Sequence, residues 1–217
     1  MGTIDRKLAA DLRDQLRLRR AVETGTFRGI TARSLASLFD RVITIELSAS
    51  LHEQATIGLG DLPQVEAVHG DSVEVLGAIA RSDVPTLYFL DGHWSGGATE
   101  GVENECPVLE EIAAIGTGHP NDCMLIDDAR LFTAAPPPPH DPAHWPTIID
   151  VFDAIRSQRP GHMVTLLADQ IIAVPPQAKP AIDSYNARLH TRPVSVHSRV
   201  LSALAATRFR FDRLRSP

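Results

Sequence analysis

The sequence predicts an α/β protein built on a doubly wound, mostly parallel seven-stranded sheet, a Rossmann-like arrangement with an antiparallel hairpin at one edge. Two observations predict it. Up to residue 129, short apolar segments typical of buried strands alternate five times with segments of helical spacing. Such alternation is typical of a parallel sheet with crossover helices. Beyond residue 129 the alternation stops, and two adjacent strand-like runs within 162–176 indicate the edge hairpin.

The periodicity of apolar residues places each element in turn. Residues 4–19 are expected to form an N-terminal amphipathic helix, because apolar residues recur every four positions from Ile4 to Leu16. A very short strand opens the segment 21–29. Apolar and β-branched runs predict further strands at 41–47, 65–71, 85–92 and 122–129. Helical spacing separates these strands at 30–39, 49–57, 72–81 and 103–115.

The last third of the chain has a different organisation. Its proline-rich run excludes an inner strand or a helix and predicts a stiff flap over 133–146. A helix is expected at 147–158, followed by the hairpin, whose turn lies at residues 168–170. One more helix is expected near 195–207. No repeat and no long linker interrupts the sequence, so we expect a single domain over 1–217.

Composition excludes several classes of protein. Of the 217 residues, 43% are hydrophobic, which is typical of a folded domain and excludes a disordered chain. The net charge is −6 and the basic residues are dispersed, which argues against a nucleic-acid partner. No apolar run is long enough for a membrane span, and the first twenty residues have no signal-peptide core. The two cysteines are too few for a disulfide framework, so we expect a cytoplasmic protein.

Acidic side chains end the first three predicted strands, at Glu23, Glu46 and Asp71. Ligands of open α/β sheets bind at the carboxyl ends of the strands, so these acids are candidate ligand contacts. The turn over 23–29 lacks the G-x-G-x-x-G pattern of dinucleotide binders. Its leading carboxylate would repel a pyrophosphate and attract the ammonium group of S-adenosylmethionine. Glu46 is placed to accept hydrogen bonds from ribose hydroxyls, and Asp71 to lie beside the adenine.

Four segments together carry a resemblance to a known family: VETGTFRG, ITIELS, HGDS and YFLDGH, which begin at residues 22, 43, 69 and 88. They resemble the successive motifs of class I S-adenosylmethionine-dependent methyltransferases, over residues 20–130. The cofactor contacts that the resemblance implies are Glu23, Thr24, Gly25, Thr26, Gly29, Glu46, Leu47, Ser48, Asp71, Ser72, Asp91 and Gly92. The alternative is a dehydrogenase-like or non-catalytic nucleotide-binding domain, in which the acids only cap helices.

Three more carboxylates follow the next two predicted strands: Asp91 after the first, and Asp127 with Asp128 after the second. These strands are neighbours in the predicted sheet, so the carboxylates converge, and one would take up a proton unless a cation intervened. Oxygen ligands with open positions suit Mg²⁺, which would acidify an acceptor hydroxyl beside the methyl donor. The alternative is that Asp127 or Asp128 caps a helix or pairs with Arg130.

This second pattern resembles metal-dependent O-methyltransferases, and the macrocin O-methyltransferase-like sugar enzymes more closely than catechol O-methyltransferases. It also resembles the mannoside O-methyltransferases of methylmannose polysaccharide assembly, and cephalosporin hydroxylase-like proteins share it. The resemblance implies a sugar or oligosaccharide hydroxyl as the acceptor. A small phenolic or antibiotic-like acceptor stays open as an alternative.

The remaining expectations concern the acceptor and the general base. Trp94 is expected to stack on a sugar ring, and Glu105 to face its hydroxyls unless it is a first-turn acid of the 103–115 helix. The candidate bases are His93, which is close to Asp91 in sequence, and His144 in the flap. Relatives often place their base three positions after the first metal acid, where this chain has Trp94. The other histidines receive no role. The N-terminal helix or the 195–207 helix is a candidate homodimer contact.

Overall fold

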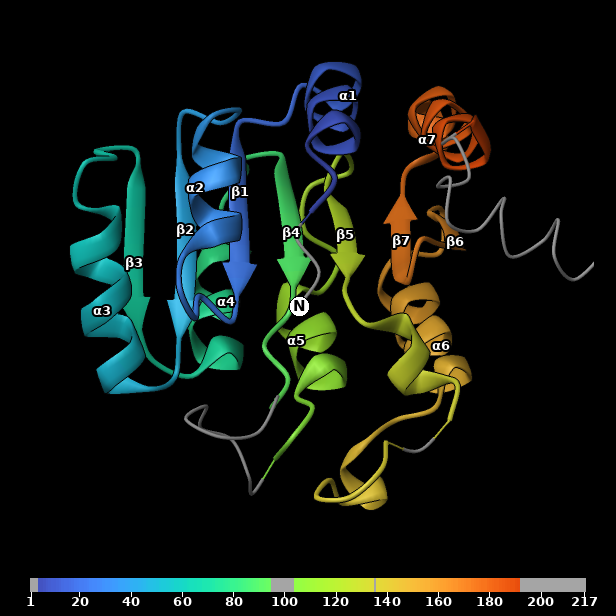
Figure 1. Cartoon of the computed structure of the whole chain (residues 1–217). Helices are drawn as coiled ribbons and strands as arrows, with labels where there is room; N and C mark the ends of the chain where they lie inside the picture. The colour runs from blue at the N-terminus through green and yellow to red at the C-terminus, as the bar shows by residue number, and fades with distance from the viewer. Residues whose placement is uncertain (1–3, 95–103, 135, 192–217) are drawn as a thin grey trace, which may run out of the picture. The chain divides into compact units, whose positions relative to one another are not determined.

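The computed structural model describes residues 4–94, 104–134 and 136–191, and these residues include a seven-stranded sheet of order β3-β2-β1-β4-β5-β7-β6 (Figure 1). The strands are β1 (Arg20–Thr24), β2 (Val42–Glu46), β3 (Val65–His69), β4 (Thr86–Leu90), β5 (Cys123–Ile126), β6 (Met163–Leu167) and β7 (Gln170–Val174). Strands β1 to β5 pair in parallel, and β7 pairs antiparallel with both β5 and β6. The predicted fold class is confirmed.

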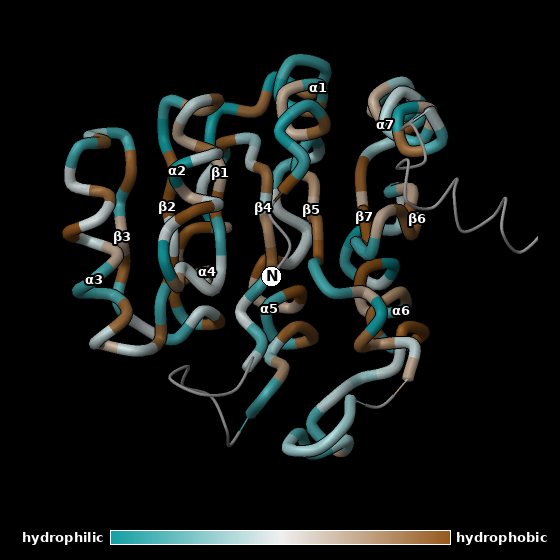
Figure 2. The backbone as a smooth tube through the Cα atoms, in the orientation of Figure 1, coloured by the Kyte–Doolittle hydropathy of each residue, from teal (hydrophilic) through white to brown (hydrophobic). Residues whose placement is uncertain are grey.

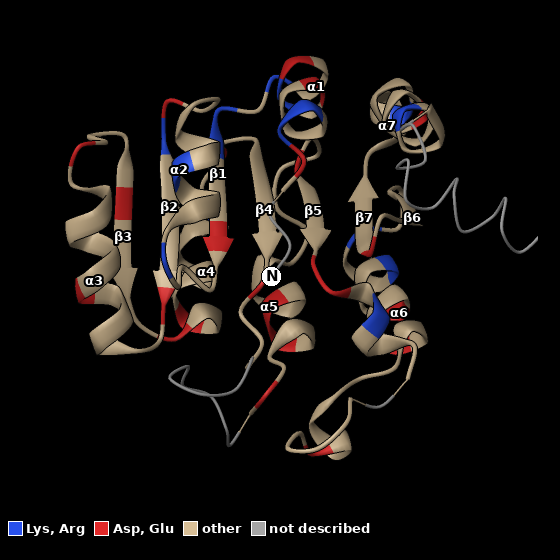
Figure 3. Cartoon of the chain, viewed as in Figure 1, with Lys and Arg blue, Asp and Glu red and all other residues tan. Residues whose placement is uncertain are grey.

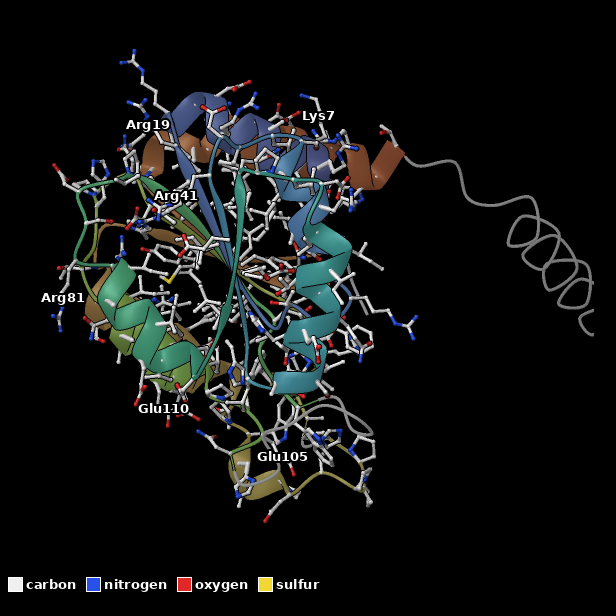
Figure 4. All side chains as sticks on the ribbon, turned by 90° about the vertical axis from the view of Figure 1, so that its left-hand side faces the viewer. Lys7, Arg19, Arg41, Arg81, Glu105 and Glu110 are labelled. Carbon is white, nitrogen blue, oxygen red and sulfur yellow. The ribbon has the colours of Figure 1, made fainter. Side chains whose placement is uncertain are left out.

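The helices cover both faces of this sheet. They are α1 (Arg6–Leu16), α2 (Ile30–Ala36), α3 (Ala49–Leu59), α4 (Ser72–Ile79), α5 (Val108–Ile115), α6 (Ile148–Gln158) and α7 (Lys179–Thr191). Helices α2 and α3 lie on one face, and α4 and α5 on the other (Figure 4). Because both faces are covered, β1, β2, β4 and β5 are buried along their whole length, whereas the edge strand β3 is only partly buried. Hydrophobic residues run along β4 and β7 (Figure 2).

The order of the strands determines where a ligand can bind. The chain runs outward from β1 through β2 to β3, then returns to place β4 on the other side of β1. The carboxyl ends of β1 and β4 therefore lie at the point where the strand order reverses, which is the usual ligand site of open α/β sheets.

The predicted hairpin is present, and its turn explains its position. Ala168 and Asp169 connect β6 to β7 and both have positive φ angles, 49° and 67°. Two successive residues of this conformation are characteristic of a two-residue type I′ turn, which matches the twist of antiparallel strands.

The structure corrects the predicted bounds of two helices and adds a short helix within the flap. The first helix covers Arg6–Leu16 rather than 4–19, because Asp5 caps its start and Arg17 adopts a left-handed conformation, with φ of 55°, that ends it. The helix predicted at 103–115 begins only at Val108, after Pro107. The flap predicted over 133–146 contains one short 3₁₀ helix at Pro142–His144, with Pro142 at its first position, where a missing N–H costs nothing.

The chain divides into two compact units, Met1–Tyr185 and Asn186–Pro217. The first holds the sheet, and the described part of the second is the end of α7. A single domain over 1–217 stays a prediction, and the helix expected near 195–207 lies outside the described residues. Among the described helices, none combines the length and the apolar character needed to cross a membrane.

Candidate functional site

Acidic residues gather where the parallel strands end. Figure 3 shows them at the carboxyl ends of β1 and β2 and on the segments that follow β4 and β5. The structure thus brings together, along one edge of the sheet, the acids that the sequence predicted as ligand contacts.

Glu23 is a buried carboxylate near the end of β1. It accepts a hydrogen bond of 2.7 Å from Thr44 Oγ1, and Thr44 also contacts Thr26 Oγ1 at 2.7 Å. Burial raises the pKa of Glu23 to about 8 despite the hydrogen bond from Thr44, and the nearby charges of Asp91 and Glu46 act in the same direction as burial. A positively charged ligand at this point would restore its ionised form.

Glu46 ends β2, and its two oxygens hold the adjacent turns. Oε2 accepts from the backbone N–H of Phe27 at 2.8 Å, and Oε1 accepts from that of Ser48 at 3.0 Å. Ser48 is buried and occupies the position before the first residue of α3, whereas Leu47 between Glu46 and Ser48 is 42% exposed. Glu46 thus links the first turn to the end of β2, where the ribose of a nucleotide is expected.

The turn after β1, residues 23–29 and here called the first turn, packs directly against the segment that follows β4. Gly25 has φ of 79°, and a Cβ atom there would lie 2.3 Å from the carbonyl oxygen of Asp91, so only glycine fits. The N–H of Asp91 donates to Thr24 Oγ1 at 3.2 Å. Gly29 also has a positive φ, 69°, and lies at the start of α2. These contacts join the turn predicted to bind the cofactor to the segment predicted to bind the metal.

Asp71 lies after β3 and is exposed. Its Oδ1 accepts hydrogen bonds from the N–H groups of Val73 and Glu74, at 2.7 and 3.3 Å, so it caps α4. This is the helix-capping role that the sequence left open. The predicted adenine contacts of Asp71 and Ser72, the first residue of α4, stay predictions.

Two of the three predicted metal ligands, Asp91 and Asp128, meet around a histidine, and Asp127 is not part of this group. Asp91, His93 and Asp128 each offer an atom within 4.8 Å of the others. His93 Nε2 lies 3.1 Å from Asp128 Oδ2, and its Nδ1 lies 3.7 Å from Asp91 Oδ1. Asp127 follows β5 and accepts from Gln170 at 3.1 Å through Oδ1. Its buried Oδ2 has no hydrogen-bond partner within the described part of the chain.

The aspartates that follow β4 and β5 have opposite pKa shifts. Burial raises the pKa of Asp91 to about 7 and also raises the pKa of Asp127. Hydrogen bonds from His93 and Arg130 lower the pKa of Asp128 to about 2. Burial alone would lower the pKa of His93, but Asp128 and Asp91 outweigh it and the net shift is upward. The ion pair of Asp128 with Arg130, 2.6 Å long, is the alternative that the sequence left open, and it is present beside the cluster.

The segments over this edge carry Trp94, Glu105 and His144. Trp94 packs edge-on against His140, with ring centroids 5.1 Å apart. Glu105 precedes α5, is 2% exposed and accepts hydrogen bonds from the flap, so it is not a first-turn acid of that helix. His144 Nδ1 lies 3.9 Å from Glu105 Oε1 and is buried without a hydrogen bond to any described residue.

No family model and no curated protein sequence matches the chain. Its structure is similar to a Staphylococcus aureus protein assigned as a caffeoyl-CoA O-methyltransferase. The TM-score is 0.58 at 16% identity, over 80% of this chain and 85% of that one. It is also similar to the Podospora anserina methyltransferase PaMTH1 solved with S-adenosylhomocysteine. There the TM-score is 0.55 at 17% identity, over 78% of this chain and 75% of that one. The chain has the Rossmann-like methyltransferase fold.

Two residues at the carboxyl ends of the strands, Glu111 and His140, were not predicted from the sequence. Glu111 on α5 is buried, lines a small cavity with Gly92 and His93, and its Oε1 accepts no hydrogen bond from the described residues. The helical spacing of the sequence could have predicted its burial, because Glu111 shares one helix face with Val108, Ile112 and Ile115. His140 was left without a role, although it donates to Glu105.

Proposed function

We propose that this protein is an S-adenosylmethionine- and Mg²⁺-dependent O-methyltransferase whose acceptor is a sugar hydroxyl. The observation that carries the proposal is the row of buried and half-buried carboxylates at the carboxyl ends of the parallel strands, with raised pKa values at Glu23, Asp91 and Asp127. Buried acids are costly unless they are neutral or paired with positive charge. A cationic methyl donor and a divalent ion would supply that charge.

The donor is proposed to lie over the first turn. Glu23 and the backbone between Thr24 and Gly29 would hold its methionine part, Glu46 its ribose, and Asp71 with Ser72 its adenine. The close contact between Gly25 and Asp91 brings the donor side and the acceptor side of the site together. The fold shared with PaMTH1, a structure containing S-adenosylhomocysteine, supports this placement.

The residues present fit a divalent cation. Asp91 and Asp128 converge on His93, and Asp127 Oδ2 is a buried oxygen that lacks a donor among the described residues. The carboxylate oxygens of Asp91 and Asp128 are ligands that Mg²⁺ prefers, whereas the set that includes His93 suits Mn²⁺ equally well, and Asp127 would have to turn towards the group to join it. A bound cation would polarise the acceptor hydroxyl.

The chain must also take up a proton. In the proposed transfer the acceptor oxygen bonds to the methyl carbon, the carbon–sulfur bond breaks to leave S-adenosylhomocysteine, and the hydroxyl proton passes to a base. Both nitrogens of His93 face carboxylates, which favours its protonated form. His144 has a buried Nδ1 to which no described residue is hydrogen-bonded, so we place the base there first.

The acceptor is proposed to be a sugar. Trp94 and the acidic floor suit a polyhydroxylated, uncharged molecule, and a mannoside of polysaccharide biosynthesis is the first acceptor to test. The protein from Staphylococcus aureus is assigned as a caffeoyl-CoA O-methyltransferase, so phenolic acceptors belong in the same screen. A cytoplasmic location and a homodimer stay predictions.

The test is a methyl-transfer screen with isotope-labelled S-adenosylmethionine against mannosides, other mono- and oligosaccharides, and phenols. We expect transfer to a sugar, abolished by EDTA and restored by Mg²⁺. Transfer only to phenols would refute the sugar acceptor, and full activity in EDTA would refute the metal. Calorimetry with S-adenosylhomocysteine and with NADH tests the donor. Binding of NADH alone would overturn the methyltransferase in favour of a dehydrogenase-like domain.

A further inference from the structure

A second buried carboxylate centre lies outside the row of acids at the strand ends. Within the described residues, the carboxylate of Glu105 accepts three hydrogen bonds, all from the flap segment 140–145. Oε2 accepts from His140 Nδ1 at 2.9 Å and from Trp145 Nε1 at 2.8 Å, and Oε1 accepts from the backbone N–H of Asp141 at 3.0 Å. Figure 4 shows Glu105 among the side chains of the flap.

The rings that Glu105 holds extend to the proposed acceptor side of the site. Trp145 packs edge-on against His93, with ring centroids 5.5 Å apart, and His93 is hydrogen-bonded to Asp128. His140 packs edge-on against both Trp145 and Trp94, at 5.5 and 5.1 Å. A continuous series of contacts therefore runs from Glu105 through Trp145 to the proposed metal ligands.

The chemistry of these bonds makes them stronger than ordinary contacts of a loop. Burial opposes the charge of Glu105, but the donors outweigh it and lower its pKa, so the carboxylate is ionised at neutral pH. Hydrogen bonds to an ionised acceptor are roughly twice as strong as neutral ones. Donation from Nδ1 also fixes one tautomer of neutral His140, with Nε2 left as an acceptor.

We propose that Glu105 is a positioning residue that holds residues 140–145 of the flap, with Trp145 against His93 and His144 beside the acceptor. The proposal rests on the proposed function, because it assigns the flap to the acceptor side of that site. It differs from the direct substrate contact that the sequence suggested, since both oxygens of Glu105 are engaged by the flap.

The chain offers both a spectroscopic probe and a matched control. Trp94 and Trp145 are the two tryptophans of the sequence, and both belong to this ring cluster. Glu110 is an exposed acid five residues further on, and Figure 4 labels both residues. Glu105→Gln removes the charge at nearly constant volume, and Glu110→Gln makes the same chemical change at the surface.

We expect Glu105→Gln to increase acrylamide quenching of tryptophan fluorescence and to shift the ¹⁵N signals of His140 towards a mixture of tautomers. The acceptor KM should rise roughly tenfold, since a charge-assisted hydrogen bond is weakened, while the Kd of S-adenosylhomocysteine stays unchanged. Glu105→Asp should recover part of the acceptor KM. Glu110→Gln should match the wild type in every measurement.

Quenching and ¹⁵N signals equal to those of Glu110→Gln would overturn the inference, and neither measurement needs an active enzyme. An increase in KM that is accompanied by an equal loss of S-adenosylhomocysteine affinity would also overturn it. If Glu105→Gln does not fold, Trp145→Phe removes the Nε1–H donor and keeps an aromatic ring. The acceptor KM of this variant should rise while the Kd of S-adenosylhomocysteine stays unchanged. A wild type that transfers no methyl group would instead refute the proposed function, and the fluorescence difference would still identify Glu105 as the residue that holds the flap.

Discussion

The two ends of the parallel sheet bury charged residues in opposite ways. At the amino end, Asp122 and Arg159 form an ion pair of 3.1 Å with both side chains 2% exposed. Asp122 also accepts from the N–H groups of Thr86 and His119, and Arg159 donates to the carbonyl oxygens of Gly116 and His119. The two charges of this pair are matched, and its hydrogen bonds are made within the fold.

At the carboxyl end the buried acids are not all satisfied by hydrogen bonds. Glu111 Oε1 and Asp127 Oδ2 are buried without a partner among the residues that the structure describes, and burial raises the pKa of Glu23 and of Asp91. Natural proteins rarely leave buried polar atoms unpaired without a reason. The buried ion pair, with its hydrogen bonds completed, stabilises the fold. The acids at the carboxyl ends are negatively charged groups whose hydrogen bonds are incomplete, and such a set is suited to a cationic ligand.

The largest expected effect is on stability, at the amino end. Arg159→Ala leaves the carboxylate of Asp122 buried without its ion-pair partner, which should lower the free energy of unfolding by about 3–5 kcal/mol. Urea denaturation measures it, with the exposed Arg156→Ala as the matched control. A loss no larger than that of Arg156→Ala would contradict the contrast between the two ends.

The same contrast predicts a loss of function without a loss of stability at the carboxyl end. Asp91→Asn removes a proposed metal ligand and one of several crowded acids. Methyl transfer should fall by about 10²–10³-fold, while the free energy of unfolding stays equal or rises. The exposed Glu53→Gln serves as the control. Destabilisation as large as that of Arg159→Ala would show that Asp91 belongs to the structural network instead.

A smaller effect is expected from the candidate bases. His144→Ala should lower turnover by about 10²-fold with the affinity for S-adenosylhomocysteine kept, because only proton transfer is affected. His93→Ala should also lower turnover, since it removes the side chain between Asp91 and Asp128. Near-wild-type rates in both variants would exclude a histidine base.

The sequence predicted the fold because the strands obey local rules. Runs such as TLYFL and CMLI are apolar throughout, as strands covered on both faces must be, and the acids that follow them lie at one edge by topology alone. The proposed row of contacts from Glu23 to Asp128 therefore follows from the order of strands and acids along the chain.

The flap could not be predicted in this way, because its contacts join distant positions without a repeating pattern. The bond between Glu105 and Trp145 spans 40 residues, and His140 is a single imidazole in a proline-rich run. Glu111 was missed for a different reason: an acid within an apolar helix face breaks the periodicity used to recognise helices, although that break is itself a sign of a buried functional group.

The last effect is the pH dependence of stability that the carboxyl end should cause. The pKa of Glu23 is about 8 in the folded protein, whereas the ordinary value of 4.5 applies to the unfolded chain. The folded state therefore binds more protons between these values, and the free energy of unfolding should fall as pH rises from about 4.5 to 8. Glu23→Gln removes this contribution, so its unfolding free energy should depend less steeply on pH than that of the wild type or Glu53→Gln. Saturation with S-adenosylhomocysteine, which carries an ammonium group, should also flatten the wild-type profile, because a paired Glu23 stays ionised. Parallel profiles for wild type and Glu23→Gln would show that the charge of Glu23 is already balanced within the fold, as that of Asp122 is at the other end.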